Sequence, residues 1–292
     1  MRTSLQALKR SLPTAITALM TLLFYIIFVE QPNVLRKTSS EMNDALSVAK
    51  KGDAVADVVC YPRCFIQPVF SAKEYHDYFT KMEGTCSRWE KFGVKGAPWG
   101  GLKYVCLDPK FNIRPGNCTV LSFGIDNEWS FDDDFDAFGC KVYSFDPTMG
   151  KEDHDRSRNI KFLSLGISNA DSIRTVGMDA NFKPHKVSRF VTILERLNLT
   201  HTPIDYVKMD VEWSELDFFQ DMFFNTPHLL KNIKQIGMEI HDGDSAGDLG
   251  PKTLYQHFWF YYQLLRCHGF KLIHARQASI WHEVVWARED NW

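Results

Sequence analysis

The sequence lacks a strong charge of either sign. Its 292 residues include 34 Lys and Arg and 36 Asp and Glu, which gives a formal net charge of -2. Basic stripes with interleaved aromatic residues are missing as well, so nucleic acid is not an expected partner. With 45% hydrophobic and 14% aromatic residues, the chain can instead bury one large core or two small ones.

Zinc-binding patterns are also missing, because neither a C-x-x-C pair nor a nearby histidine pair occurs, and no metal is expected. Six of the seven cysteines fall between residues 60 and 140. Disulfide bonds are natural there in an oxidising compartment, although buried free thiols are an alternative. The pairing stays open, and the odd cysteine is expected to be free. The seven are Cys60, Cys64, Cys86, Cys106, Cys118, Cys140 and Cys267.

One long hydrophobic run stands near the start of the chain. Leu12–Val29 holds 18 residues without a charge, close to the roughly 20 that span a bilayer as a helix. Arg2, Lys9 and Arg10 precede it without an acidic residue, whereas both signs are mixed after it. This asymmetry favours a cytoplasmic N-terminus and a lumenal body, as in a type II signal-anchor. A cleaved signal peptide and a buried helix are the alternatives, but no A-x-A site follows the run.

The region after this run is polar up to residue 57 and lacks aromatic residues, which is typical of a stem. Two N-glycosylation sequons, at Asn117 and Asn198, are no more than chance would give, but both lie in expected loops before strands, and a glycoprotein is expected. We expect a single-pass membrane protein whose body faces the lumen of the endoplasmic reticulum or Golgi. The expected parts are a cytoplasmic tail, a transmembrane helix, a stem and a folded body, at residues 1–11, 12–29, 30–57 and 58–292.

The body alternates short apolar runs with helical patterns, at the spacing of β-α-β units. Strands are expected at 118–124, 140–146, 160–166, 204–210 and 233–240. Helices are expected near 128–138, 187–198, 215–224 and 252–268. Such alternation indicates a parallel sheet with helices on both faces. The runs 270–276 and 280–288 have only a short connection, so they are expected to form an antiparallel hairpin.

Ligands of such sheets bind beyond the carboxyl ends of the strands, where the strand order reverses. Gly124 ends the first strand, and a glycine there lets the backbone approach a ligand closely. Asp146 ends the second strand, where an acid accepts hydrogen bonds from ribose hydroxyls. A turn aspartate is the alternative for Asp146. The other candidate positions at strand ends are Gly166 to Ser168, Asp210 with Glu212, and Glu239 with His241.

The turn after the first strand differs from a phosphate-binding loop. It has one glycine, and the acids around the following helix start are Asp126, Glu128, Asp132, Asp133 and Asp134. A helix N-terminus attracts anions, and acids placed there would repel a pyrophosphate. The pattern therefore argues against a dinucleotide or ATP. S-adenosylmethionine carries an ammonium and a sulfonium but no phosphate, so acidic surroundings suit it. Alternatively, some of these acids only cap a solvated helix.

The fourth and fifth strand ends supply candidate catalytic groups. Ser214 with Asp217 fits a capping box for the next helix, which leaves Asp210 and Glu212 in the loop above the sheet. His241 follows the fifth strand and is suited to accept a proton from a substrate hydroxyl. A structural role is the alternative for all three, and their spacing is not diagnostic of a metal site.

These segments together resemble a known family. The strand pattern with its terminal hairpin is similar to that of class I S-adenosylmethionine-dependent methyltransferases. Three segments resemble more closely the methyltransferase-like protein 24 family, a relative of the FkbM methyltransferases. They are SFGIDNEWSFDDDFDAFGCKVYSFDPT, KMDVEWSE and MEIH. The similarity covers roughly residue 86 to the C-terminus. The resemblance implies a Rossmann-like α/β fold: a mostly parallel seven-stranded sheet with a terminal antiparallel hairpin, here preceded by one transmembrane helix.

The resemblance also implies the site. The residues expected to bind the cofactor are Gly124, Asp126, Asp146, Ile167, Ser168 and Asp210. The residues expected to act on the acceptor are Asp210, His241 and Glu212, with Asp210 ranked first. Because FkbM relatives methylate hydroxyls, the expected reaction is O-methylation of a glycan, glycoprotein or other hydroxyl-bearing acceptor of the secretory pathway.

Three positions depart from the FkbM pattern, namely Ser122, Glu128 and Trp213. Extra bulk at such positions narrows a cofactor pocket. A membrane-anchored protein with this fold but without catalytic activity is therefore the alternative function. A lumenal oxidoreductase on the same core is a further alternative, against which the acid-rich turn argues.

Overall fold

The structure, a computed structural model, describes residues 66–93, 101–176, 183–242, 254–277 and 281–289. The expected anchor and stem lie outside these ranges, so both stay predictions. No helix within the described ranges is long and apolar enough to cross a membrane. All of these ranges belong to the unit Tyr61–Trp292.

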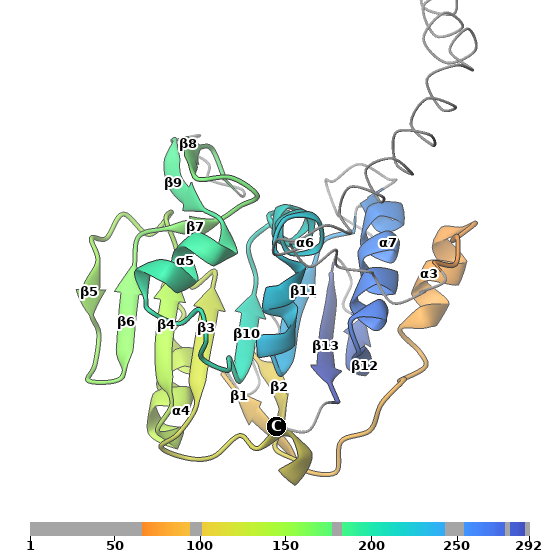
Figure 1. The fold of residues 1–292 in the computed structure, drawn as a ribbon, viewed down its shortest axis with the longest axis horizontal. Helices are drawn as coiled ribbons and strands as arrows, with labels where there is room; N and C mark the ends of the chain where they lie inside the picture. The colour runs from red at the N-terminus through yellow and green to blue at the C-terminus, as the bar shows by residue number, and fades with distance from the viewer. Residues whose placement is uncertain (1–65, 94–100, 177–182, 243–253, 278–280, 290–292) are drawn as a thin grey trace, which may run out of the picture. The chain divides into compact units, whose positions relative to one another are not determined.

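A large mixed sheet forms the centre of the described chain (Figure 1). In order across the sheet, its eight strands are β12 (Phe270–Gln277), β13 (His282–Arg288), β11 (Gln235–Ile240), β10 (Tyr206–Met209), β3 (Thr119–Phe123), β4 (Lys141–Phe145), β6 (Ile160–Leu163) and β5 (His154–Asp155). The five strands from β11 to β6 pair in parallel, whereas β13 pairs antiparallel with both β11 and β12. The expected parallel sheet with a terminal hairpin is confirmed.

The third expected strand is shorter than predicted. β6 ends at Leu163, because Leu165 N–H donates back to the Leu163 carbonyl and turns the chain out of the sheet. Gly166–Ile167 then forms β7 in a separate three-stranded sheet with β9 (His185–Ser188) and β8 (Ser172–Arg174). The prediction of seven strands was also wrong by one. The two-residue edge strand β5 adds an eighth, too short to leave a pattern in the sequence.

Helices cover both faces of the large sheet. In Figure 1, α5, α6 and α7 lie in front of it, and α4 lies behind it together with the hairpin of β1 and β2. The helices are α3 (Ala72–Tyr78), α4 (Ser130–Phe138), α5 (Phe190–Arg196), α6 (Glu215–Phe224) and α7 (Leu254–Cys267), with the short 3-10 helices η1 (Pro109–Phe111) and η2 (Pro227–Asn232). The hairpin strands are β1 (Trp89–Phe92) and β2 (Lys103–Cys106). The predicted helix at 187–198 starts later, because its first residues belong to β9.

Two hydrophobic cores result, one on each face of the sheet. The front core joins α3, α5, α6 and α7 to the sheet and includes Phe218, Tyr262 and Trp286. The back core lies under α4 and the β1–β2 hairpin and includes Phe131 and Val285. Neighbouring side chains of a strand point to opposite faces, and both faces of this sheet are covered. A central strand such as β11 is therefore buried along its whole length.

Two disulfide bonds join described cysteines of the back core, as the cysteine content predicts. Cys118–Cys140 joins the residues that precede β3 and β4. Cys86–Cys106 ties the end of β2 to the segment before β1. The second bond therefore fixes the hairpin that covers the back of the sheet.

Candidate functional site

The strand order reverses between β3 and β10, because β3 leads to β4 on one side and β10 to β11 on the other. Gly124 follows β3 and Asp210 follows β10 at this point. Gly124 has a φ of +81°, and a Cβ there would lie 1.6 Å from the Asp210 carbonyl oxygen. Only glycine fits this turn, so the two loops meet closely where such sheets bind ligands.

Asp146 shapes the turn from the neighbouring strand. Its Oδ2 accepts the N–H groups of Ile125 and Asp126 at 2.9 and 2.8 Å. Its Oδ1 accepts the N–H and the hydroxyl of Thr148 at 2.8 and 2.6 Å. A carboxylate offers about four lone-pair positions, so those of Asp146 are all used. A ribose hydroxyl would therefore have to share one of these oxygens with the backbone or side-chain donors already bound there.

The acids on α4 are engaged in contacts within the fold. Asp132 is buried and accepts the Ser144 hydroxyl at 2.5 Å, and burial raises its pKa to about 6. Asp133 pairs with Arg156 at 2.7 Å. Asp134 accepts a backbone N–H from the β1–β2 hairpin at 2.9 Å. These three acids serve the fold, and the acidic character of the turn comes from the exposed Asp126 and Glu128.

A buried lysine from the back hairpin reaches the carboxyl end of the sheet. Lys103 is fully buried, and its Nζ lies 2.8 Å from Glu283, 3.7 Å from Asp210 and 3.8 Å from Glu239. Burial alone would lower the pKa of Lys103, but these three carboxylates raise it above its ordinary value. Lys103 is therefore the charged centre of a cluster, called here the lysine cluster, that comprises these four residues.

A second lysine lies beside Asp210. Lys208 Nζ donates to the Gly124 carbonyl and lies 3.9 Å from the Asp210 carboxylate. Burial alone would raise the pKa of Asp210, but Lys103 and Lys208 hold it below its ordinary value. Burial, and then Asp210, raise the pKa of Glu239 to about 7. Asp210 is thus an anion held in place, while Glu239 exchanges protons near neutral pH.

His241 lies between two carboxylates at the end of β11. Its Nδ1 is 3.7 Å from Glu212 and its Nε2 is 3.8 Å from Glu239. The sheet therefore brings Asp210, Glu212 and His241 to one edge, although the chain separates them by up to 31 positions. Asp210 keeps 21% of its side chain exposed, so it remains open to a ligand.

The predicted capping box at the start of α6 was wrong. The Ser214 backbone is helical, and its side chain makes no capping hydrogen bond. Instead Glu215 reaches back and accepts the Val211 N–H at 3.1 Å. The reason is the turn before the helix, where Glu212 and Trp213 both have positive φ, at 48° and 72°.

The predicted contacts from the third strand lie deeper than expected. Ile167 is 1% exposed and belongs to β7, and Ser168 is fully buried directly after it. The Ser168 hydroxyl lies 3.4 Å from Asp217 on α6, a contact inside the protein. Their contact with a cofactor stays a prediction.

Sequence reasoning missed Lys103, Lys208 and Glu283. Lys208 did leave a signal, because a lysine inside an otherwise apolar strand needs a buried anionic or carbonyl partner. Lys103 and Glu283 are 180 positions apart in the sequence, and their hydrogen bond left no local pattern.

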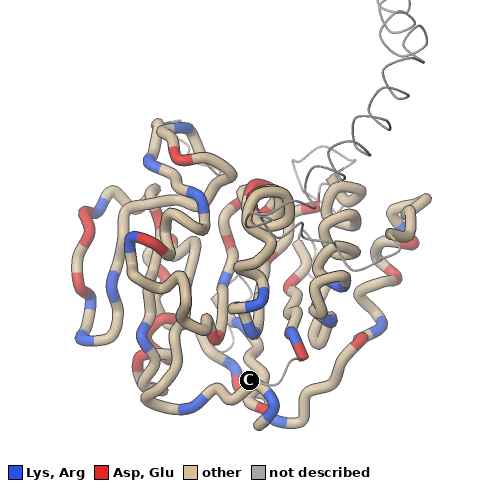
Figure 2. The backbone as a smooth tube through the Cα atoms, in the orientation of Figure 1, with Lys and Arg blue, Asp and Glu red and all other residues tan. Residues whose placement is uncertain are grey.

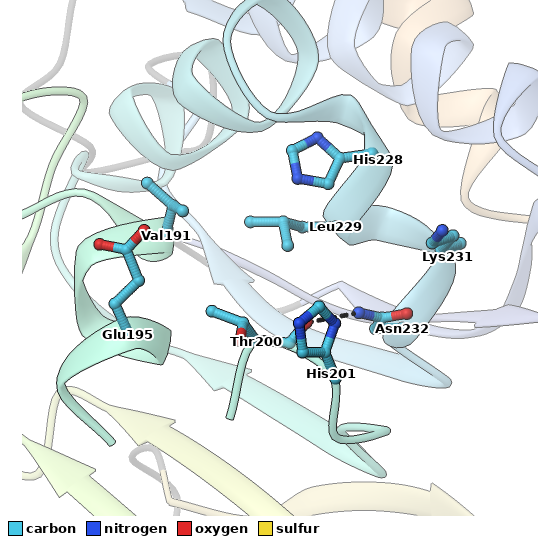
Figure 3. Close-up of a pocket in the computed structure, with 8 residues that line it drawn as sticks. All are labelled: Val191, Glu195, Thr200, His201, His228, Leu229, Lys231 and Asn232. Atoms are coloured by element: carbon cyan, nitrogen blue, oxygen red, sulfur yellow. Dashed lines mark hydrogen bonds between the residues drawn. The ribbon is translucent and has the colours of Figure 1, made fainter. Parts of the chain in front are cut away.

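A cavity of about 550 Å³ lies at the other end of the strands (Figure 3). It is lined by Thr200 and His201, which precede β10, and by η2, which precedes β11. Asn232 donates to the Thr200 carbonyl at its edge. Because it lies at the amino ends of the strands, this cavity is separate from the cluster around Asp210.

The residues at the carboxyl edge fit S-adenosylmethionine. The Gly124 turn allows a close backbone approach, and the exposed Asp126 suits the positive ammonium and sulfonium of the cofactor. Asp210 adds a fixed negative charge at the same edge. The buried indole N–H of Trp213 has no hydrogen-bond partner among the described residues, which leaves a donor for a ligand.

Comparison with solved structures gives weak similarities. The 16S rRNA (adenine(1408)-N(1))-methyltransferase of Catenulisporales acidiphilia, as a variant, is 11% identical with a TM-score of 0.32, over 70% of this chain and 100% of that one. A structure of the same variant with the cosubstrate SAM is 12% identical, with a TM-score of 0.33 and the same coverage of both chains. The crystal structure of EvdMO1 is 13% identical with a TM-score of 0.26, over 68% of this chain and 44% of that one.

No curated protein matches the chain in sequence. A family described as a methyltransferase domain does match, over residues 59–280, which is well over half of the chain. The sheet order and the Gly124 turn agree with that match. The chain therefore belongs to this methyltransferase domain family, and its cofactor is S-adenosylmethionine.

Proposed function

We propose that this protein is an FkbM-related methyltransferase, similar to the methyltransferase-like protein 24 family, that transfers a methyl group to a hydroxyl oxygen. One observation carries the proposal. The carboxyl ends of β10 and β11 place a fixed anion, Asp210, beside Glu239, whose pKa is raised to about 7, and the His241 imidazole lies 3.8 Å from Glu239. Such a set suits an acceptor that must lose a proton as it is methylated.

When bound, S-adenosylmethionine supplies an electrophilic methyl group on a positively charged sulfur. Asp210 is held charged by Lys103 and Lys208, so its role is to attract the sulfonium end and to orient the acceptor. Positioning of this kind supplies roughly 7–11 kcal/mol of a barrier. A group with a low pKa is a weak base, and we therefore assign proton removal to His241, with Glu212 and Glu239 flanking its ring.

The proposed acceptors are glycans, glycoproteins or other hydroxyl compounds of the secretory pathway. The supports are the uncharged run Leu12–Val29 and the sequons at Asn117 and Asn198. In microsomes, protease should leave the body protected and the first residues exposed. Loss of a glycosylation shift in the Asn117→Gln, Asn198→Gln double variant would support a lumenal body. Digestion of the body from the cytoplasmic side would contradict it.

The decisive experiment for activity uses the full chain with S-adenosylmethionine labelled in the methyl group. Calorimetry measures cofactor binding, and label transfer is followed over a panel of glycans and other hydroxyl compounds. Label on an acceptor oxygen that resists treatment with base is the expected product, since an ether does not hydrolyse as an ester does. Label on nitrogen or on a carboxylate would contradict O-methylation.

A second candidate is a cofactor-binding protein without turnover, which Glu128 and Trp213 favour because both add bulk next to the site. Glu128 accepts the Ser130 N–H and lies beside Gly101, where it borders the turn. Binding of the cofactor without transfer to any acceptor would support this candidate. If a Glu128→Gly, Trp213→Gly variant then gained turnover, bulk at these two positions would be the reason.

A further inference from the structure

A second buried polar cluster lies on the front face of the sheet. It consists of His76 on α3, Asp242 two residues after the end of β11, and His282 at the start of β13. His282 directly precedes Glu283 of the lysine cluster, and neighbouring side chains of a strand point to opposite faces. This histidine cluster is therefore separated from Lys103 by the sheet itself.

Three possible ligand atoms converge in this cluster. His282 Nε2 lies 2.9 Å from the Asp242 carboxylate and 3.1 Å from His76 Nδ1. All three atoms lie within 4.8 Å of one another. Two ligands of a tetrahedral zinc ion, at bonds of about 2.0–2.1 Å, are roughly 3.3 Å apart. The two separations from His282 need to widen by only a few tenths of an ångström to admit an ion, and His76 Nδ1 and the Asp242 carboxylate lie within 4.8 Å of each other.

Hydrogen bonding alone serves the His282 ring poorly. The Nε2 of His282 faces both His76 Nδ1 and the Asp242 carboxylate, and it carries at most one proton to share between them. The Nδ1 of His282 is buried and has no hydrogen-bond partner in the described part of the chain. A cation accepts lone pairs from all three atoms at once, and it leaves Nδ1 of His282 as the protonated nitrogen.

The cluster is held rigidly. Asp242 is fully buried and His282 is 1% exposed. The His282 ring stacks on Phe79, with centroids 4.5 Å apart and an interplanar angle of 24°. Burial, and then Tyr262 and Asp242, raise the pKa of Tyr75 well above its ordinary value, so its hydroxyl stays protonated as a donor toward Asp242. Such surrounding contacts orient metal ligands in known sites.

We propose that His76, Asp242 and His282 bind a divalent transition-metal ion, with zinc the best match. Two imidazoles and one carboxylate are a common zinc donor set, and imidazole also suits copper, nickel and iron. A three-ligand site leaves a coordination position for water. The ion would join α3 to the ends of β11 and β13, next to the loop that carries His241. This proposal does not depend on methyl transfer.

The test uses the full chain, without a histidine tag, after removal of metal with a chelator. Calorimetry with Zn²⁺ should show one tight equivalent per chain. Asp242→Asn and His282→Gln should each weaken the affinity on the order of 100-fold. Zn²⁺ should also raise the Tm of the unaltered chain and not that of the variants, because ligand binding stabilises the folded state.

The matched control is His274→Gln. His274 is a partly buried histidine on β12 that stacks on Tyr104, with centroids 3.9 Å apart, away from the cluster. The His274→Gln variant should keep the full zinc affinity. Absence of stoichiometric uptake by the unaltered chain would overturn the proposal, and so would equal uptake by His282→Gln. If the variants do not fold, the visible absorption spectrum of the unaltered chain with added Co²⁺ tests the site instead. Visible absorption of a tetrahedral imidazole-ligated ion supports the site, and its absence refutes it.

Discussion

The two faces of the sheet balance buried charge differently at the same end of the molecule. Behind the sheet, Glu283, Glu239 and Asp210 surround Lys103, so the compensating cation is part of the chain. In front of it, the histidine cluster brings together two imidazoles and the buried carboxylate of Asp242. A lysine carries its charge within the chain, whereas imidazoles and a carboxylate together can bind a metal ion. The back cluster thus contains its own cation, and the front cluster offers ligands for a cation from solution.

Both clusters are attached to the same pair of strands. β11 and β13 carry Glu239 and Glu283 toward one face, and Ile240 and His282, which are paired in register, toward the other. Charges of both signs are interspersed over the rest of the described chain (Figure 2). The strand pair β11–β13 thus carries members of both clusters, one on each face of the sheet.

Removal of the built-in cation should have the largest effect. Lys103→Met leaves Glu283 buried without its cation, which should lower the free energy of unfolding by about 3–5 kcal/mol. Urea unfolding with intact disulfides measures this loss. Adding Glu283→Gln to Lys103→Met should restore part of the stability, because one unpaired buried charge is then removed.

The control for Lys103 is Lys91→Met in the same hairpin. Lys91 is exposed and lies over the Tyr104 ring at 5.1 Å, so its loss should cost at most about 1 kcal/mol. Equal losses for the two variants would show that the buried carboxylates are already neutral, and the contrast between the faces would fail.

The next largest effect concerns the two ends of β10. Asp210→Asn should slow methyl transfer by on the order of 10²-fold, with a small change in stability, because the amide is nearly isosteric and loses only the charge. The turnover number is measured with saturating S-adenosylmethionine.

The matched variant is Asp205→Asn at the amino end of the same strand. Asp205 pairs with Lys234 at 2.7 Å and accepts the Thr119 N–H at 2.7 Å. It should lose stability by about 1–3 kcal/mol and keep its turnover number. Full turnover in Asp210→Asn would remove Asp210 from the chemistry, and His241→Gln would then be the variant to measure.

Stability should depend on pH through Glu215 at the start of α6. Burial raises its pKa from 4.5 to about 7. The folded state therefore binds more protons than the unfolded state between these values, so stability falls as pH rises through this window and is highest below it. The slope from one such group is at most about 1.4 kcal/mol per pH unit. The Glu215→Gln variant should lack this contribution.

Unfolding by urea at several pH values measures the difference between the unaltered chain and Glu215→Gln. Only this difference is informative, because other carboxylates titrate in the same range. The same slope in both proteins would show that Glu215 is ionised in the folded state.

The smallest effect separates two serines at helix starts. Ser214→Ala should change the free energy of unfolding by less than about 0.5 kcal/mol, because the Ser214 side chain makes no capping bond. Ser71→Ala should cost about 1 kcal/mol, because the Ser71 hydroxyl accepts the Glu74 N–H at 3.2 Å at the start of α3. Thermal or urea unfolding measures the loss of stability in the two variants. A larger loss for Ser214→Ala than for Ser71→Ala would support the capping box after all.

The fold was more predictable than the site. Periodic apolar runs located the five parallel strands and the hairpin, because burial on both faces requires continuous apolar segments. The site was predictable only where a residue ends a strand, as Gly124, Asp210 and His241 do. Asp146 was located correctly at a strand end, but its hydrogen bonds to Ile125 and Thr148 depend on the three-dimensional turn.

The sequence by itself determined that Gly124, Asp210 and His241 meet at the carboxyl edge, because parallel strands bring their ends together whatever the details of packing. The tertiary structure alone decided the charge of that edge. Lys103 comes from a hairpin far away in the chain, and a lysine acquires a buried partner only when distant segments pack. The same holds for His76 and His282, 206 positions apart, which are neighbours only because α3 packs against the start of β13. Local patterns report on strands and helices, whereas buried ionic contacts depend on long-range packing that no local pattern encodes.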